Sequence, residues 1–361
     1  MLSGQEAQND PDDAIRATDD DAAASRLSAV TLGYLDDPYT SLLYKPPRMH
    51  AGPSAIRKAP LINVGTHHRT AAIDLLVDKF LDQAGPNAQI VSLGAGSDTR
   101  YWRLRDKNRQ IRRYVEVDFP HITSIKAQRI SRSPKLSSRL GPTPSSSSTS
   151  APTASGSSHT DTSTMLPPPA PREKPYTVQK GGTQLVSDTY FLLPLDLRQH
   201  PSSTLSEQLL PHLDRTAPVL FLAECVFCYM APELSADILG WFGRTFNTLA
   251  GVIYEMCGLQ DTFGQVMRRN LAARHLSLPG AEPFPDIASQ AARFVDPSLG
   301  EGVFQQSGAK SLWDIRQSVI DPDEITRISK LEFLDEIEEL RLVLNHYCVA
   351  WGTKSLSSVS L

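Results

Sequence analysis

The sequence AQIVSL at Ala88–Leu93, followed by the turn Gly94-Ala95-Gly96, decides the fold. Its apolar run has the length of a buried strand, and the two glycines let the chain turn sharply where the strand ends. The segments Thr99–Arg105 and Arg113–Val117 (RYVEV) predict a short helix and a second strand. A strand, a glycine turn, a helix and a strand in about 30 residues form one βαβ half of an open parallel sheet.

The same alternation resumes further along the chain. It predicts strands at Tyr190–Leu193, Val219–Ala223, Val252–Glu255 and Cys348–Lys354, and helices at Asp20–Gly33, Ala71–Leu81, Ser206–Leu210, Pro232–Thr248 and Phe333–Tyr347. We therefore expect a doubly wound, Rossmann-like α/β sheet. Residues 23–50 are expected to form an N-terminal helical lid, and the long region from Asp261 to Gln317 is expected to form an added helical cap.

Two stretches lack the apolar residues that a core needs. Residues 1–22 are rich in Asp, Ala and Gln and predict a disordered acidic arm, and residues 131–176 are a low-complexity insertion of Ser, Thr and Pro. Such segments bury too little apolar area to offset the entropy lost on ordering. Because the strands on both sides of the insertion continue one pattern, we expect a single domain over 23–361 that the insertion interrupts.

Composition narrows the class of protein. Of 361 residues, 40% are hydrophobic, and 36 Lys and Arg against 40 Asp and Glu leave a net charge of −4. That balance argues against a nucleic-acid partner, which needs a basic surface. The longest apolar run, Ala217–Ala231, is too short to cross a membrane. The polar N-terminus does not resemble a signal peptide, and the four cysteines are too few for a disulfide framework, so we expect no membrane partner and an intracellular protein.

Small or acidic residues stand at the carboxyl ends of the predicted strands, where ligands of such sheets bind. They are Gly94, Gly96, Asp118, Asp196 and Glu224. Asp118 follows the glycine turn at the spacing of a carboxylate that accepts hydrogen bonds from two ribose hydroxyls. Thr99 stands where the dinucleotide fingerprint has its third glycine. This departure disfavours NAD and favours S-adenosylmethionine, a nucleoside without a pyrophosphate.

Longer segments extend this interpretation. The chain resembles the leucine carboxyl methyltransferases in VTLGYLDDPY (30–39), VSLGAGSDTRYWRL (91–104), YVEVDFP (114–120), PLDLR (194–198), FLAECVFCYM (221–230), YEMCGLQDTFGQVMRRNL (254–271) and LEFLDEIEELRLVLNHYC (331–348). The resemblance implies a class I methyltransferase fold, S-adenosylmethionine as cofactor and S-adenosylhomocysteine as its product. The implied substrate is the C-terminal leucine carboxylate of the protein phosphatase 2A catalytic subunit. The resemblance also implies a monomer that docks on the tail and the folded body of that phosphatase, in the cytoplasm and also in the nucleus.

Matched position by position, the resemblance assigns cofactor contacts. Gly94 and Gly96 form the glycine turn, with Gly94 against the methionine part of the cofactor. Asp118 holds the ribose. Asp196 and Leu197 meet the adenine, with Asp196 accepting a hydrogen bond from its exocyclic amine.

The resemblance also assigns residues near the methyl group. Glu224 faces the amino-acid portion of the cofactor, and Arg69 lies near the cofactor carboxylate, where it is expected to orient the incoming leucine carboxylate. Arg26 occupies a position where some relatives have lysine, and it could equally pair with Asp19–Asp21. Tyr229 is either a substrate contact or a core aromatic residue. Because a terminal carboxylate, with a pKa of about 3.5, is already ionised, no general base is expected.

Other interpretations remain open at this point. A related group modifies a tRNA base side chain, but its members carry a long repeat domain after the methyltransferase part, whereas this sequence ends at Leu361. An NAD-dependent oxidoreductase and a non-catalytic phosphatase-binding protein are further alternatives. Cys225 and Cys228 are expected to be structural, because a zinc site needs a second pair at metal spacing. His67-His68 is expected to be a pocket-edge or surface pair.

Overall fold

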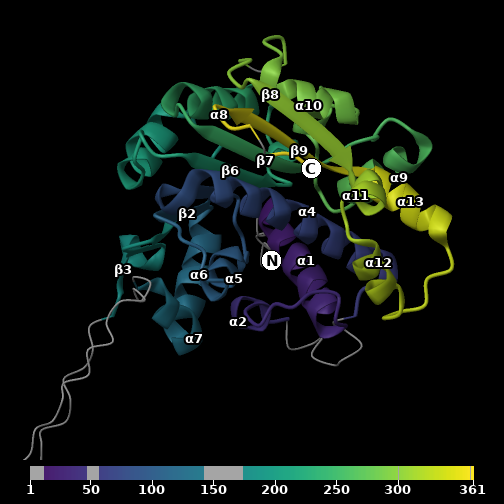
Figure 1. The fold of residues 1–361 in the computed structure, drawn as a ribbon, viewed down its shortest axis with the longest axis horizontal. Coiled ribbons are helices and arrows are strands. Elements are labelled where there is room, and N and C mark those ends of the chain that lie inside the picture. Colours follow the sequence, from purple (N-terminus) through teal and green to yellow (C-terminus); the bar gives the residue numbers. More distant parts are fainter. Residues whose placement is uncertain (1–11, 47–56, 142–173, 300, 358) are drawn as a thin grey trace, which may run out of the picture.

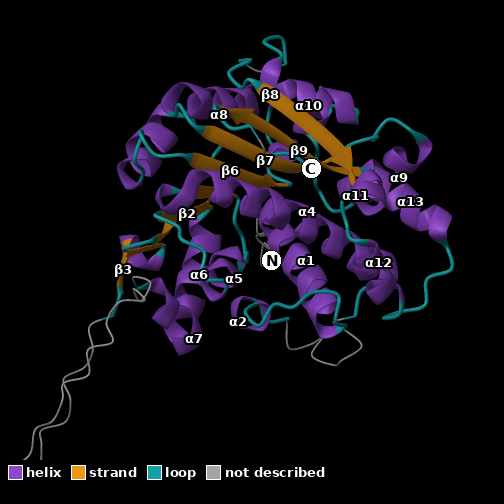
Figure 2. Ribbon diagram, viewed as in Figure 1, coloured by secondary structure: helices purple, strands orange, loops and turns teal. Residues whose placement is uncertain are grey.

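The computed structural model describes residues 12–46, 57–141, 174–299, 301–357 and 359–361. Within them one mixed sheet is flanked by helices on both faces (Figures 1 and 2). Its strands are β1 Gln89–Leu93, β2 Arg113–Asp118, β3 Tyr176–Gln179, β4 Gln184–Ser187, β5 Tyr190–Pro194, β6 Val219–Glu224, β7 Leu249–Met256, β8 Gln306–Ser311 and β9 Tyr347–Lys354.

The strand order confirms the doubly wound prediction. Neighbouring strands follow the order β3-β4-β5-β2-β1-β6-β7-β9-β8. The five central strands from β5 to β7 are parallel, and the order reverses at β1, which pairs with β2 on one side and β6 on the other. The late strand β9 runs antiparallel to β7. This is the class I methyltransferase arrangement, and it directs the carboxyl ends of β1, β2, β6 and β7 to one edge.

Helices cover both faces of the sheet. The main ones are α1 Asp13–Thr31, α2 Thr40–Leu43, α4 Pro60–Ala84, α5 Arg100–Asp106, α6 Pro120–Arg132, α7 Pro134–Ser137, η5 Ser202–Leu209, α8 Pro232–Thr245, α9 Thr262–Ala272, α10 Ile287–Val295, α11 Leu312–Ser318, α12 Pro322–Ser329 and α13 Ile337–Asn345. Successive strand residues point to opposite faces, so Ile90 joins an apolar cluster with α4 and α5 while Val91 joins a second cluster with α8. The central strands are therefore buried on both sides, as their continuous apolar runs predict.

The predicted acidic arm extends too far. Residues 1–11 lie outside the described residues, but α1 begins at Asp13, so residues 13–22 are helical. Carboxylates at the start of this helix pair with groups far away in the sequence. Asp12, just before α1, pairs with Arg198, and Asp19 accepts from the backbone N–H and the hydroxyl of Ser97. A short polar stretch orders here because it lies against polar partners. Those partners are distant in the sequence, so the local sequence pattern does not identify them.

The predicted insertion is also too long at both ends. Residues 142–173 lie outside the described residues, whereas α6 continues to Arg132 and is followed by α7. Leu136 and Leu140 in this stretch are fully buried, and Tyr176 begins β3. Two isolated leucines in a polar stretch were enough to attach it to the core.

Three strands of the sheet do not follow from the sequence pattern. β3 and β4 form an antiparallel hairpin at one edge, and β8 pairs with β9 at the other. The expectation of a helical region from 261 to 317 is therefore wrong at β8, whose sequence QSGAKS has no apolar alternation. Gly308 in β8 fits because a Cβ there would collide with the ring of Trp351.

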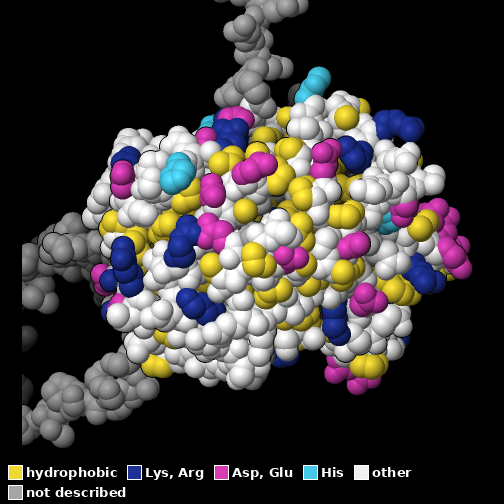
Figure 3. Space-filling model, turned by 90° about the horizontal axis from the view of Figure 1, so that it is seen from above, with side chains coloured by type: hydrophobic (Ala, Val, Ile, Leu, Met, Phe, Trp, Pro, Cys, Tyr) yellow, Lys and Arg dark blue, Asp and Glu magenta, His cyan; other side chains and the backbone are white. Residues whose placement is uncertain are grey.

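The outer surface carries mixed charge. Seen from above, hydrophobic side chains lie between acidic and basic ones, and the basic side chains on this face are dispersed rather than joined in a stripe (Figure 3). None of the helices in the described part of the chain is both long and apolar enough to span a bilayer.

Candidate functional site

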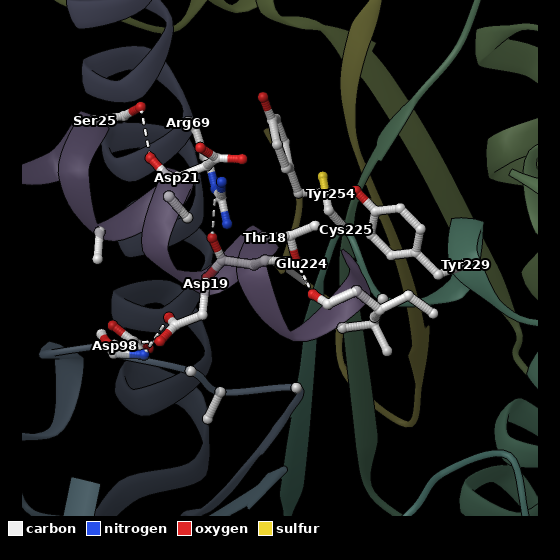
Figure 4. Close-up of a pocket in the computed structure, with 18 of the residues that line it drawn as sticks. Thr18, Asp19, Asp21, Ser25, Arg69, Asp98, Glu224, Cys225, Tyr229 and Tyr254 are labelled. Carbon is white, nitrogen blue, oxygen red and sulfur yellow. Dashed lines mark hydrogen bonds and ion pairs between the residues drawn. The ribbon is translucent and has the colours of Figure 1, made fainter. Parts of the chain in front are cut away.

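A cavity of about 440 Å³ opens at the carboxyl ends of the central strands. Its volume lies in the range typical of pockets that hold a cofactor. α1 and α4 enclose it together with the ends of β1, β2, β6 and β7, and α9, α13 and β9 complete it (Figure 4). The predicted lid and cap therefore both contribute, the lid through Ser25 and Arg26 of α1 and the cap through Leu271 and Leu276. Residues of α1 that fall in the predicted acidic arm, such as Ile15 and Asp19, line the cavity as well.

Glu224, the last residue of β6, is the centre of the charged part of the cavity. Its Oε2 accepts a hydrogen bond from Nε of Arg69 at 2.7 Å, and its Oε1 accepts one from Nη2 of Arg100 at 2.8 Å. Figure 4 shows Arg69 reaching from α4 towards Glu224. Burial works to raise the pKa of Glu224, but the two guanidinium groups outweigh it and hold that pKa below its ordinary value. Glu224 is therefore a carboxylate at neutral pH.

Arg69 lines the cavity from α4. Its guanidinium carbon lies 4.5 Å from the centroid of the Tyr254 ring, so a cation–π contact adds to the ion pair with Glu224. Its Nε is the atom that hydrogen-bonds to Glu224, and among the described residues the Nη atoms have no partner. About a quarter of the side chain (26%) is exposed to the cavity side. These donors are available to a ligand carboxylate.

Arg100 was not singled out from the sequence, although it is the most enclosed charge in the site. Its side chain is 3% exposed and contacts Asp98 at 2.6 Å, Glu224 at 2.8 Å and Asp74 at 3.1 Å. A signal was present, because a positive charge in the first turn of a helix opposes the helix dipole and calls for a carboxylate partner. We refer to Arg69, Asp98, Arg100 and Glu224 as the charged wall.

The glycine turn has the geometry that its sequence predicts. Gly94 and Gly96 both have positive φ angles, of 60° and 47°. A Cβ on Gly94 would lie 2.6 Å from a methyl group of Val226, so a larger residue does not fit. The backbone N–H of Gly96 donates to Oδ2 of Asp118 at 2.7 Å. The turn and the end of β2 are thereby joined in one rigid corner of the cavity.

Asp118 fits a ligand with paired hydroxyl groups. Its second oxygen accepts from the backbone N–H of Phe119 at 2.7 Å, so both described donors are neutral. Burial raises the pKa of Asp118 to about 6, and these two N–H groups offset it only in part. Two hydroxyl donors would stabilise the ionised form. The residues present therefore fit the ribose of S-adenosylmethionine.

Asp196 is paired with a neighbouring arginine. It accepts from the backbone N–H of Arg198 at 3.0 Å and from its Nε at 2.9 Å, and it forms an ion pair with Nη2 at 2.8 Å. In the described residues, Leu197 and Arg198 line the cavity and Asp196 does not. Leu197 is thus placed to contact an adenine ring. Asp196 holds Arg198, which in turn reaches Asp12 before α1.

Arg26 lines the cavity but is not paired with Asp19–Asp21. Its Nε donates to buried Asp37 at 2.7 Å, and its Nη1 donates to Thr70 at 3.2 Å. Asp21 instead pairs with Arg274. Arg26 thus connects α1 to α4, and its cationic head is committed to Asp37.

The opposite side of the cavity is apolar. Its side chains come from η7 Phe227–Tyr229, from β7, α9 and β9, and from the loop after α9. We refer to Tyr229, Met256, Leu271, Leu276 and Tyr347 as the apolar wall. Tyr347 stacks on Tyr254 with parallel rings whose centroids are 5.5 Å apart. Tyr229 lines the cavity, and Tyr254 does so from β7. Cys225 lies between them (Figure 4).

The histidine pair is buried, which corrects the expectation of a pocket-edge or surface pair. His67 and His68 are 3% and 0% exposed, and their Nδ1 atoms lie 3.0 Å apart. His67 contacts Glu324 at 2.8 Å and His68 contacts Arg316 at 3.1 Å, so the pair joins α4 to α11 and α12. Across the described ranges, no group of three or more His, Cys, Asp or Glu side chains has metal-binding geometry.

The chain is similar in sequence to known proteins of one family. The family model described as "Leucine carboxyl methyltransferase" matches residues 5–243. Leucine carboxyl methyltransferase 1 of Cryptococcus neoformans var. neoformans serotype D is 56% identical, over 97% of this chain and 96% of the relative. The Bos taurus protein of that name is 33% identical, over 97% and 92%. Among solved structures, a DUF574 family protein from Streptomyces avermitilis has a TM-score of 0.49 at 14% identity, covering 91% of this chain and 97% of that one.

Proposed function

Because the chain belongs to the leucine carboxyl methyltransferase family and is an S-adenosylmethionine-dependent carboxyl methyltransferase, we propose that its substrate is the C-terminal leucine of the protein phosphatase 2A catalytic subunit. The reaction forms a methyl ester on the α-carboxylate of that leucine and releases S-adenosylhomocysteine. The observation that carries this proposal is the position of Arg69 between Glu224 and the apolar wall, in a cavity large enough for a cofactor and a leucine side chain.

The charged side of the cavity supplies what the cofactor needs. S-adenosylmethionine brings a methyl group activated by a sulfonium centre. Glu224 would hold its amino group, Asp118 its ribose hydroxyls, and the turn at Gly94 allows its methionine part to approach the backbone. Leu197 would contact the adenine.

The acceptor needs orientation more than activation. A terminal carboxylate is ionised at neutral pH, so an oxygen lone pair can attack the methyl carbon without a general base. The main requirements are removal of its hydration water and in-line approach, and near-attack geometry contributes roughly 7–11 kcal/mol. Burial opposes the charge of Arg69, but Glu224 raises the pKa of Arg69 above its ordinary value. Arg69 therefore stays cationic and would orient the carboxylate through its Nη atoms.

The apolar wall would accept the leucine side chain. It is formed by two tyrosines, two leucines and a methionine. Full burial of a leucine side chain contributes about 1.5–3 kcal/mol. That is too little for tight binding of a tail alone, so we propose that the folded body of the phosphatase also docks on the enzyme.

A label-transfer assay tests the substrate. The enzyme is incubated with methyl-labelled S-adenosylmethionine and the phosphatase catalytic subunit, either complete or without its terminal leucine. Label is expected on the complete subunit only, and more slowly on a free tail peptide. Label that persists without the leucine would overturn the substrate assignment, and absence of label on both would favour a non-catalytic binding protein.

Arg69→Ala tests the proposed role of Arg69 in the same assay. Loss of one positioned donor to a reacting oxygen typically reduces turnover by about a hundredfold to a thousandfold. We expect a loss of that size with saturating substrates, while the circular dichroism spectrum stays unchanged. Near-normal turnover would exclude the role assigned to Arg69.

A further inference from the structure

Arg100 is enclosed by carboxylates on three sides. It is the first residue of α5, directly after the glycine turn, and its side chain is 3% exposed. Its Nη1 contacts Asp98, its Nη2 contacts Glu224 and its Nε contacts Asp74, all within 3.1 Å. Its backbone N–H also donates to Asp98, at 2.9 Å. Each nitrogen of this side chain therefore has a carboxylate partner, and the guanidinium group is held by the protein on three sides.

Arg100 lies at the centre of a balanced buried network. The network joins four guanidinium groups with four carboxylates, and its members are Arg26, Arg69, Arg100, Arg103, Asp37, Asp74, Asp98 and Glu224. Arg103 contacts Asp74 and Asp37, on the side away from Glu224. Arg100 therefore connects Glu224 to the rest of the network, whereas Arg103 does not touch Glu224.

We propose that Arg100 is a positioning residue, which acts on the cofactor through Glu224. By holding Oε1 of Glu224, it leaves Oε2 to Arg69 and fixes the plane of the carboxylate at the end of β6. The same side chain holds Asp98, so the glycine turn and Glu224 keep a constant separation. This inference concerns the family's cofactor and is independent of the identity of the methyl acceptor.

The charges around Glu224 give this inference a measurable consequence. Burial raises the pKa of Glu224, Arg69 and Arg100 lower it, and Asp98 raises it. Without Arg100, burial and the Asp98 carboxylate would be opposed mainly by Arg69, so the pKa of Glu224 would rise. Its charge would then be lost as pH falls through that higher pKa. Titration of Glu224 should then make cofactor affinity depend on pH in a range where Glu224 of the native protein stays ionised.

The experiment compares three variants by calorimetric titration with S-adenosylhomocysteine, without any methyl acceptor. Arg100→Met removes the charge at similar length, Arg100→Lys keeps the charge but not the three-way contact, and Arg103→Met is the matched control in the same network. Each is measured at about pH 8 and about pH 6, on both sides of neutrality. Thermal unfolding shows which variants are folded. If Arg100→Met does not fold, the milder Arg100→Lys change still tests the proposal.

We expect Arg100→Met to weaken binding by about tenfold or more at the higher pH, because a buried charge partner of Glu224 is lost. At the lower pH the loss relative to the native protein should be larger, beyond any change in affinity that the native protein itself shows between the two values. Arg100→Lys should restore most of the native pH dependence but only part of the affinity, and Arg103→Met should stay close to the native protein at both values. Affinities of both Arg100 variants within about twofold of native would overturn the proposal. So would an equal, equally pH-dependent loss in Arg103→Met, because that result would assign the effect to general stability.

Discussion

The two walls of the cavity are built in opposite ways. The charged wall comes from β6, α4 and α5, and its members Arg69, Arg100 and Glu224 are paired with one another before any ligand arrives. The apolar wall comes from η7, β7, α9, the loop after α9 and β9, and it contributes mainly apolar contact area. Binding at the charged wall should therefore depend on the charge and position of single side chains. Binding at the apolar wall should depend on the volume of the side chains.

The largest expected effect is the loss of the central carboxylate. Glu224→Gln leaves two enclosed guanidinium groups with a neutral partner, and breaking a buried ion pair costs about 3–5 kcal/mol. We expect a fall in the free energy of unfolding towards that size and loss of measurable S-adenosylhomocysteine binding. Chemical denaturation and calorimetry measure the two quantities. Glu207→Gln, on the exposed side of η5, is the matched control and should change neither.

If Glu224→Gln bound S-adenosylhomocysteine within a few fold of the native protein, the charged wall would be a structural network only. The cofactor would then have to be held by Asp118 and the glycine turn. That result would remove the difference between the two walls, because ligand binding at neither wall would depend on a paired charge.

The second effect concerns Asp118, a charge that the fold does not neutralise. Burial raises its pKa from 3.8 to about 6, so the folded protein holds this proton more tightly than the unfolded chain does. A raised pKa means that the folded protein is destabilised when Asp118 ionises. This loss in the free energy of unfolding is absent below about pH 4, grows as pH rises to about 6, and reaches about 3 kcal/mol.

Asp118→Asn should remove this pH dependence from the free energy of unfolding, while it weakens S-adenosylhomocysteine binding. Denaturant unfolding between about pH 4 and about pH 8 measures the first, and calorimetry the second. In the native protein the affinity should fall as pH drops below about 6, because a neutral carboxyl group is a poorer acceptor for ribose hydroxyls. An unchanged pH profile in Asp118→Asn would show that another group sets it.

The sequence pattern was sufficient for the elements that carry local signals. Apolar strands that end in a small or acidic residue predicted β1, β2, β6 and the positions of Asp118 and Glu224 at one edge of the sheet. Their burial confirms the pattern, because a strand buried on both faces must be apolar throughout. The glycine turn was predicted for the same reason, since positive φ angles restrict the choice of residue.

What could not be predicted depends on partners distant in the chain. The role of Arg100 depends on its ion pairs with Asp74 on α4 and Glu224 on β6, and no spacing in the sequence connects these residues to it. The start of α1 contacts Arg198 and Ser97, and the same Arg198 also pairs with Asp196. β8 is a strand because β9 offers an edge, although its own residues have little strand propensity. In each case tertiary pairing decided what local pattern left open.

The smallest expected effect lies on the apolar wall. Leu271→Ala enlarges the cavity beside α9 and removes apolar area that would contact the leucine side chain. Partial loss of such a contact is about 1 kcal/mol, so KM for the phosphatase subunit should rise about fivefold. Turnover at saturation and S-adenosylhomocysteine affinity should stay unchanged, because Leu271 has no contact with the charged wall. Steady-state kinetics and calorimetry separate these quantities.

Val266→Ala is the matched control for this change, because Val266 lies on the same helix, is 42% exposed and does not line the cavity. It should leave KM and affinity as they are. Equal effects of the two variants would assign the change to α9 as a whole, and a fall in cofactor affinity in Leu271→Ala would show that the walls act together. Because an apolar contact carries no charge, the KM effect of Leu271→Ala should be the same at every pH at which Asp118 is ionised.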